Sequence, residues 1–189
     1  MAAFAGWDRW QVRDEAGRRK YLSADELGRF LDAANRLAPD LRALCHVLAY
    51  TGCRVSEALA LTVHQLDTDR LTLTLKTLKR RRIVFRTVPV PPAMATLLLA
   101  LPLDASGRFW SLHRATAWRR VKATMCRAGI AGPMACPKGL RHGFGMRAAG
   151  LGVPTNLIQR WMGHASVTTT AIYLDAVGIE ERQFASRMW

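Results

Sequence analysis

GLRHGFGMRAAG (139–150) indicates a helix that ends in glycine, and RWMGHASVTTTAIYLDA (160–176) follows it after a short gap. The first stretch carries the cation Arg141, and the second carries the imidazole of His164 and the phenol of Tyr173. Each of these side chains is ordinary alone. Brought together within one helix and one turn, they form a set that suits chemistry on a phosphate group.

Charge indicates the class of partner. The chain has 189 residues, with 28 Lys plus Arg against 14 Asp plus Glu, which gives a net charge of +14. Colloidal stability needs a net charge of only about 2 to 8, so this excess indicates an acidic polymer, with nucleic acid as the first expectation. No apolar run reaches the roughly 18 residues of a spanning helix, and the first 20 residues lack the apolar core of a signal peptide. We therefore expect a cytoplasmic, nucleoid-associated protein without membrane contact.

The cysteines and histidines indicate no metal or redox site. They show neither CxxC pairs nor an HExxH motif, and the cysteines are expected to be reduced, with Cys45 buried. The residues concerned are Cys45, Cys53, Cys126, Cys136, His46, His64, His113, His142 and His164. We accordingly expect no metal and no cofactor.

The layout along the chain predicts one α+β domain. Residues 1–20 are polar, Arg-rich and without periodicity, and are interpreted as a basic arm. Ser23 and Glu26 form a capping-box pattern that opens the first helix. A second helix is delimited by Pro39 in its first turn and Gly52 just past its end.

The rest of the chain changes period and then returns to helix. Leucines alternate with threonines over 71–75, and a second apolar run follows a basic turn, so the segment 65–92 predicts a small antiparallel sheet. Further helices are expected over 54–63, 92–101, 114–129, 137–150, 154–163 and 166–176. The fold expected is mainly helical, with one small sheet.

Two arginines are candidates for binding a phosphodiester. A guanidinium binds phosphate through two parallel hydrogen bonds. Arg54 lies at a predicted helix start just after Gly52, where unpaired backbone N–H groups favour an anion, and Arg141 lies within a predicted helix. The alternatives are ordinary ones: Arg54 as a surface charge, and Tyr173 as a core residue of an apolar helix. The residues around them decide between these interpretations.

TGCRVSEALAL (51–61) resembles the first arginine box of the tyrosine recombinases, the family of phage integrases, Xer proteins and Cre, whose pattern is TG-x-R-x-SE-x-x-x-L. The segment 137–176 resembles their second box, which runs H-x-L-R-H, then L-G-H-x-S, then T-x-x-Y. The resemblance covers roughly 21–189, which is interpreted as the catalytic domain of such an enzyme.

The resemblance implies roles for several residues. Arg54 and Arg141 would clamp the scissile phosphate, His164 would lie beside it, and Tyr173 would be the nucleophile. Lys76 falls where the family carries a strand lysine that acts as general acid, and Lys79 is the alternative.

Three further positions complete the expected site. Lys138 stands where the family most often has histidine; it can donate a hydrogen bond to phosphate but is no base at neutral pH unless strongly desolvated. His142 and Glu57 are expected to contact the catalytic side chains rather than DNA and so to orient them.

The function implied is site-specific DNA recombination through a 3′-phosphotyrosine, without metal or nucleotide, by four protomers on two double-stranded DNA sites, with accessory DNA-bending proteins as further partners. The alternatives are a type IB topoisomerase-like enzyme and a non-catalytic DNA-binding protein of the same fold. Since residues 1–20 cannot form the usual N-terminal domain, either a minimal recombinase or an isolated catalytic domain is expected. A short helix over 179–189 is expected to dock on a neighbouring protomer or on its own domain.

Overall fold

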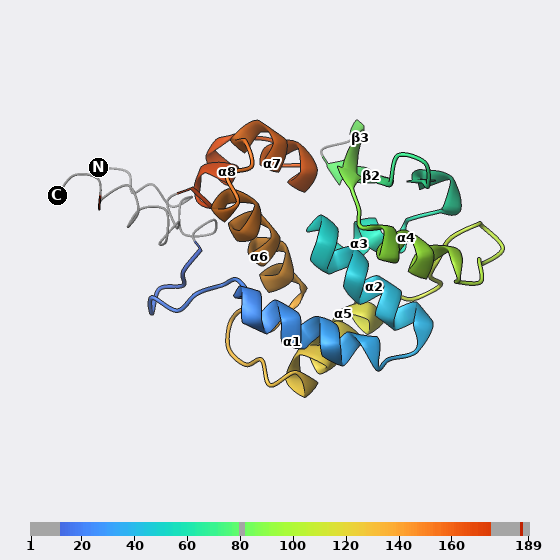
Figure 1. The fold of residues 1–189 in the computed structure, drawn as a ribbon, viewed down its shortest axis with the longest axis horizontal. Helices are drawn as coiled ribbons and strands as arrows, with labels where there is room; N and C mark the ends of the chain where they lie inside the picture. Colours follow the sequence, from blue (N-terminus) through green and yellow to red (C-terminus); the bar gives the residue numbers. More distant parts are fainter. Residues whose placement is uncertain (1–11, 80–81, 175–185, 187–189) are drawn as a thin grey trace.

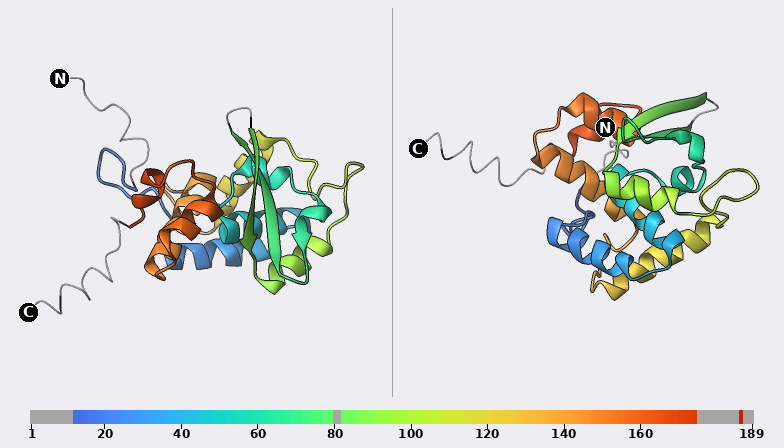
Figure 2. Two further views of the ribbon diagram at one scale, coloured as in Figure 1. Left: turned by 90° about the horizontal axis from the view of Figure 1, so that it is seen from above. Right: turned by 45° about the vertical axis from the view of Figure 1, so that its right-hand side comes forward.

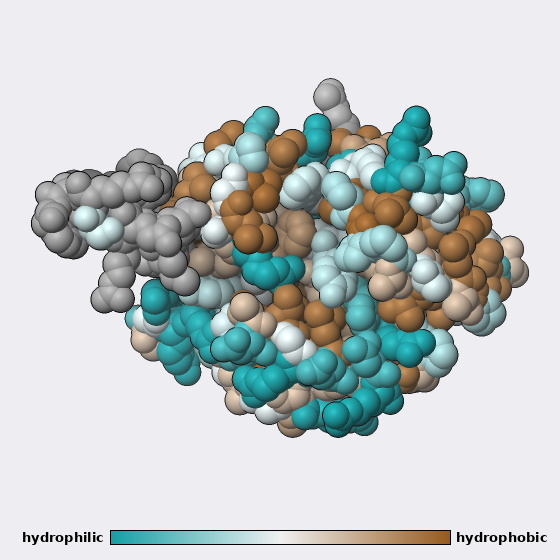
Figure 3. All heavy atoms as spheres, viewed as in Figure 1, coloured by the Kyte–Doolittle hydropathy of each residue, from teal (hydrophilic) through white to brown (hydrophobic). Residues whose placement is uncertain are grey.

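The computed structural model describes residues 12–79, 82–174 and 186. Apart from residue 186, the expected helix over 179–189 therefore lies outside the described residues. Within them, no helix is both long and apolar enough to cross a membrane. Figure 3 shows one face of the molecule, on which hydrophilic side chains gather over the helices drawn at the lower edge of Figure 1.

The first helix begins, and the second begins and ends, where the sequence predicts. Helix α1 is Ala24–Asn35, and its capping box is present: the Ser23 side chain accepts from the backbone of Glu26, whose carboxylate accepts from the backbone of Ser23. Helix α2 is Pro39–Thr51, with proline in its first turn. It stops at Gly52, which has the left-handed φ of 60° that favours glycine.

Gly52 is required for space as well as for its backbone conformation. A Cβ atom there would lie 2.7 Å from the ring of Phe144 on a later helix. The chain then turns directly into α3, Val55–Leu59, for which Arg54 is the N-cap residue. Helix α3 is shorter than the segment 54–63 that the sequence predicts, and the 3₁₀ turn Val63–Gln65 follows it.

The predicted sheet is present as three antiparallel strands in the order β1-β2-β3. They are Leu66–Asp67, Thr72–Lys79 and Arg82–Pro89. Leu73 and Leu75 of β2 are buried in the core with Val88 of β3, whereas Lys76 lies on the opposite face, paired with the exposed Phe85. The strand alternation therefore turns Lys76 away from the core.

Helices make up the rest of the fold. They are α4 (Pro92–Leu99), α5 (Arg114–Arg127), α6 (Pro137–Gly150), α7 (Thr155–Met162) and α8 (Thr168–Ala171). The last one is shorter than predicted, because the helix ends at Ala171 and Tyr173 lies in the turn that follows.

Helix α6 is central to the fold. It packs against α1, α2 and α5 on one side and α7 on the other (Figure 1). Its Leu140 belongs to the main core, whereas Phe144 belongs to a second apolar cluster that includes Ile158, Met162 and Tyr173. The β2–β3 hairpin lies along one side of the helices (Figure 2). The α+β architecture predicted from the sequence is confirmed.

Candidate active site

A cavity of about 590 Å³ opens where α3, α5 and α6 meet the segment before and after α8. Its wall is rich in cationic and aromatic side chains. The lining residues are Lys20, Cys53, Arg54, Val55, Ser56, Arg114, Trp118, Pro137, Lys138, Arg141, His142, His164 and Tyr173.

Arg141 is held by two backbone carbonyl groups. Its Nη1 donates to the carbonyl of Gly52 at 2.7 Å, and its Nη2 donates to the carbonyl of Met162. A guanidinium has five N–H donors, and these bonds use two of them, so others remain to bind an anion in the cavity. Burial, followed by the charge of Arg54, lowers the pKa of Arg141 to about 10. The side chain therefore stays cationic at neutral pH.

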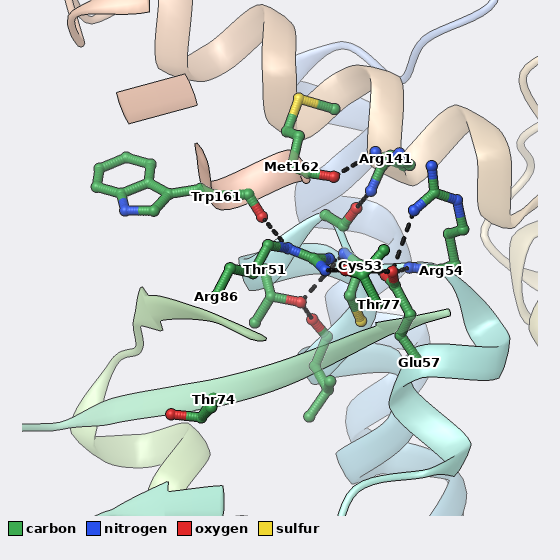
Figure 4. A network of polar contacts seen from close by, with 12 residues as sticks. Thr51, Cys53, Arg54, Glu57, Thr74, Thr77, Arg86, Arg141, Trp161 and Met162 are labelled. Carbon is green, nitrogen blue, oxygen red and sulfur yellow. Dashed lines mark hydrogen bonds and ion pairs between the residues drawn. The ribbon is translucent and has the colours of Figure 1, made fainter. Parts of the chain in front are cut away.

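Glu57 holds Arg54 in place (Figure 4). One carboxylate oxygen accepts from Nη1 of Arg54 at 3.0 Å, and the other accepts from the backbone N–H of Arg54 at 2.8 Å. The same carboxylate accepts two bonds from the buried guanidinium of Arg86, at 3.1 and 2.8 Å. Burial would raise the pKa of Glu57, but Arg86 and then Arg54 lower it to about 2. The carboxylate is therefore ionised and fixes the direction of Arg54.

Arg86 joins three parts of the fold. Besides Glu57 of α3, it donates to the hydroxyl of Thr77 on β2 and, through Nε, to the carbonyl of Trp161 at 2.7 Å. Gly163 approaches it so closely that a Cβ atom there would lie 3.0 Å from its guanidinium. The turn at the end of α7, which leads to His164, is thus tied to the sheet and to α3 (Figure 4).

Tyr173 is buried against two imidazole rings. Only 1% of its surface is exposed, and its Oη lies 3.0 Å from Nδ1 of His142. Its ring stacks on that of His164, with centroids 6.0 Å apart and planes 21° apart. Burial raises the pKa of Tyr173 to about 12, although the charge of Arg141 opposes this. The phenol is therefore protonated at neutral pH.

The two histidines differ in their hydrogen bonds. Nδ1 of His164 lies 2.9 Å from the hydroxyl of Thr170, which orients the ring. His142 is also buried, and its Nε2 has no hydrogen-bond partner among the described residues. Burial first, and then the charges of Lys138, Arg141 and Lys20, lower the pKa of His142 to about 4. His142 is therefore neutral near pH 7.

Sequence and structure comparisons agree on one family. The family model described as "Phage integrase family" matches residues 20–177, which is most of the chain. This chain belongs to the phage integrase family. It is 32% identical over 169 residues to tyrosine recombinase XerD of Corynebacterium glutamicum, covering 80% of this chain and 55% of that protein. It is 34% identical over 185 residues to XerD of Mycobacterium leprae, covering 83% of this chain and 57% of that protein.

Solved structures have the same fold. The XerA recombinase is 28% identical, with a TM-score of 0.74 over 89% of this chain and 64% of that one. The catalytic domain of bacteriophage HP1 integrase is 22% identical, with a TM-score of 0.68 over 88% of this chain and 93% of that one. The chain spans little more than half the length of the two XerD relatives named above.

The structure brings together most of the residues that the family resemblance singles out. Arg54, Arg141, His164, Tyr173 and Lys138 all line the cavity. Glu57 lies behind Arg54, as expected. His142 itself lines the cavity, and its Nδ1 lies 3.0 Å from Oη of Tyr173.

The two candidate general acids both belong to strand β2. Lys76 is absent from the cavity lining and lies on the face of β2 opposite to Thr77, which faces Glu57. Lys79 ends β2, paired with Arg82, and its side chain lies outside what the structure describes. A role for Lys76 in the cavity therefore requires the β2–β3 hairpin to approach it.

Sequence reasoning misses four residues of the cavity and its network. Lys20 falls within the predicted arm, and Arg114 and Trp118 are predicted only as parts of a helix, yet all three line the cavity. The spacing of four residues between Arg114 and Trp118, with Lys122 lying 5.1 Å from the Trp118 ring one turn later, is a signal for a basic helix face. Arg86 follows the apolar run 83–85 of its strand, and nothing in the sequence indicates that the arginine rather than that run is buried.

Proposed function

We propose that this chain is the catalytic domain of a site-specific DNA recombinase that cleaves and rejoins strands through a 3′-phosphotyrosine. The observation that carries the proposal is the convergence of Arg54, Arg141 and Tyr173 on one cavity. Two guanidinium groups and a phenol suit a phosphodiester: the cations stabilise charge on the non-bridging oxygens, and the phenol supplies the nucleophile. Its XerD relatives are named as tyrosine recombinases, which supports the same assignment.

The reaction proceeds in two steps, cleavage and rejoining. The oxygen of Tyr173 attacks the phosphorus, the bond from phosphorus to the 5′ oxygen breaks, and the 5′ oxygen leaves as a hydroxyl after receiving a proton. A 5′ hydroxyl of a second duplex then attacks the phosphotyrosine and releases Tyr173. Each step replaces one phosphoester bond with another, so their number stays the same and the cycle requires no nucleotide as an energy source.

Roles for the other residues follow from their positions. Arg54 and Arg141 bind the non-bridging oxygens, and Lys138 and His164 donate further hydrogen bonds from the cavity wall. Lys76 is proposed as the general acid for the 5′ oxygen, brought to the cavity by movement of the β2–β3 hairpin on DNA; Lys79 is the alternative. Glu57 acts on Arg54 rather than on DNA.

The partners proposed are double-stranded recombination sites bound by a homotetramer in the cytoplasm, on the nucleoid. The net charge of +14 supports an interaction with DNA phosphates. The structural neighbours include a XerH recombinase bound to its difH substrate. Accessory DNA-bending proteins are proposed as further partners.

A covalent capture experiment tests this function without assuming a target sequence. The chain is incubated with duplexes of randomised sequence, each carrying a nick close to its centre, so that cleavage releases a short 5′-hydroxyl fragment and traps the adduct. Denatured protein is then recovered, and the attached DNA is sequenced and resynthesised as one selected duplex. Tyr173→Phe is the matched control, since it removes only the phenolic oxygen.

The outcomes separate the rival functions. A recombinase gives an adduct on a defined sequence and exchanges strands between two selected duplexes. Relaxation of supercoiled plasmid by a monomer, without strand exchange, would favour the topoisomerase-like alternative. DNA retention without any adduct, equal in the wild type and Tyr173→Phe, would leave only the binding protein.

A further inference from the structure

His142 and Tyr173 share a hydrogen bond at the point where the proposed reaction begins. The distance from Nδ1 to Oη is 3.0 Å, and within the described part of the chain this is the hydrogen bond that Oη makes. Both side chains are at least nine-tenths buried, with 4% and 1% of their surfaces exposed. Water therefore has little access to the phenol, and the described protein atom that lies within hydrogen-bonding distance to take its proton is Nδ1 of His142.

The direction of this bond follows from the donors present. If Nδ1 carried the proton, it would donate to Oη, and the phenolic hydrogen would then have no acceptor among the described residues. If Nδ1 carries the lone pair, the phenol donates to it and is satisfied. The proton then lies on Nε2, the atom that has no partner within the described structure. The second arrangement leaves one unpaired donor rather than two unpaired groups, so it is the favoured one.

We propose that His142 is the general base of this site: its Nδ1 accepts the phenolic proton of Tyr173 as Oη attacks the phosphate, and returns that proton when the strand is rejoined. This inference rests on the proposed recombinase function and assigns the proton transfer within it. In the forward step the O–H bond of Tyr173 breaks, the bond from Oη to phosphorus forms, and His142 becomes an imidazolium. Rejoining reverses each change.

Other groups near Tyr173 are less suited to this role. Lys138 carries an ammonium group, which has no lone pair to accept a proton. His164 presents the face of its ring to the phenol, and its Nδ1 is bonded to Thr170. Arginine side chains remain protonated and donate only. His142 is the one whose ring nitrogen lies at hydrogen-bonding distance from Oη in the described structure.

The charges around His142 make this base dependent on substrate. Burial and the neighbouring cations lower the pKa of His142 to about 4, and burial raises that of Tyr173 to about 12. Transfer of the proton from the phenol to the imidazole is therefore unfavourable without a compensating negative charge. Lys20, Lys138 and Arg141 are the cations that disfavour the imidazolium, and a bound phosphate offsets their charge. The phenol is therefore activated only when a phosphate is bound.

Nitrogen-15 spectra of the histidine-labelled protein test the direction of the bond without DNA. We expect Nδ1 of His142 to be unprotonated and Nε2 protonated at pH 7. Tyr173→Phe removes the phenolic donor, so the resonance of Nδ1 of His142 should shift in that variant. The shift identifies which resonance belongs to this nitrogen. A protonated Nδ1 would contradict the proposal whatever the activity of the protein.

A chemical rescue tests the catalytic step on the selected duplex. In His142→Gln, the amide can still hydrogen-bond to Oη but cannot accept a proton, so adduct formation should slow by about 100-fold or more. When residue 173 is 3,5-difluorotyrosine, whose phenol is far more acidic, the loss caused by His142→Gln should shrink to less than about threefold. Arg141→Lys should show no such rescue, because its defect concerns the phosphate. His64→Gln, an exposed histidine outside the cavity, is the matched control.

The outcomes separate this inference from the function on which it rests. No adduct in the wild type would overturn the recombinase assignment and this role together. A second outcome is an active wild type, with His142→Gln slowing adduct formation equally with tyrosine and with 3,5-difluorotyrosine at residue 173. That result would overturn only the base role and leave His142 as a positioning residue. If His142→Gln fails to fold, His142→Asn is used in the same comparison, and the spectra of the wild type decide independently.

Discussion

Arg86 and Glu57 form a buried ion pair, with Nη2 and Oε2 2.8 Å apart and both side chains 4% exposed. The pair joins β3 to α3, and the same carboxylate holds Arg54 at the cavity. The orientation of a proposed phosphate-binding arginine is therefore set by a strand residue that is not part of the cavity lining. Because Arg86 also bonds to the end of α7, it links the two sides of the site.

Arg86→Met should destabilise the protein strongly. Breaking a buried pair leaves Glu57 with an incompletely compensated charge, so the free energy of unfolding should fall by about 3 to 5 kcal/mol. Urea denaturation measures this change. Arg70→Met is the matched control, because Arg70 pairs with Asp67 on the exposed surface, and its loss should leave the free energy of unfolding almost unchanged. Equal effects at the two positions would contradict the structural role of Arg86.

Acid should destabilise the protein through Glu57. Its pKa is lowered on folding from 4.5 to about 2, so its contribution is fully present above about pH 4.5 and is lost as the pH falls toward 2. This lowering of the pKa by about 2.5 corresponds to about 3 kcal/mol. The free energy of unfolding, measured in urea from pH 6 to 3, should therefore depend less on pH in Glu57→Gln than in the wild type. Asp69→Asn, at an exposed turn, should keep the wild-type slope.

Gly145→Ala should misplace the nucleophile. A Cβ atom at this position of α6 would lie 2.7 Å from Cε2 and Cζ of Tyr173, so the ring must move and Oη must leave His142. A displacement of about 1 Å can cost about 100-fold in rate, which adduct formation on the selected duplex would measure. In Gly28→Ala the added methyl meets nothing within 4 Å, and that variant should gain about 0.5 to 1 kcal/mol of stability with normal activity.

Arg141→Lys should lower the cleavage rate by about 100-fold or more, on the order of 3 kcal/mol of transition-state stabilisation. A lysine keeps the charge but cannot bond both carbonyl groups and still present a planar pair of donors to phosphate. Arg54→Ala should have an effect of the same order. The matched control is Arg147→Lys on the same helix, which bonds to the carbonyl of Ala49 and is absent from the cavity lining. Near-normal single-turnover rates in Arg141→Lys would show that Arg141 does not stabilise the transition state.

Lys138→His should remain active, within about tenfold of the wild type, if Lys138 only donates a hydrogen bond to phosphate. The substitution also removes a cation that lowers the pKa of His142, which favours proton transfer to His142 and works against any loss of rate near pH 7. Adduct formation measured across pH tests this expectation. A severe loss at every pH would show that the ammonium group has a role that imidazole cannot fill.

Local features of the fold could be predicted because their physical causes are local. The capping box of Ser23 and Glu26 satisfies helix N–H groups within four residues, and the left-handed turn at Gly52 depends on the absence of a side chain there. The positions of Arg54, Arg141, His164 and Tyr173 were recognisable for another reason. Their spacing within two short boxes matches a family pattern, and the structure places all four in one cavity.

Contacts between distant segments could not be predicted in this way. Arg86 looks like an exposed strand residue until β3 is packed against α3 and α7, where its charge is paired with Glu57. Lys20, Arg114 and Trp118 carry no motif, yet packing of α1 and α5 around α6 brings them to the cavity wall.

The amino-acid sequence by itself determined the family, the helix boundaries set by caps and glycines, and the groups available for phosphate chemistry. Only the tertiary structure decided which nitrogen faces Oη of Tyr173, because residues 142 and 173 are 31 positions apart and meet through the packing of α6 against the turn after α8. Hydrogen-bond partners of buried polar groups depend on distances of a few tenths of an ångström. Sequence spacing does not set such distances, whereas close packing of the surrounding helices does.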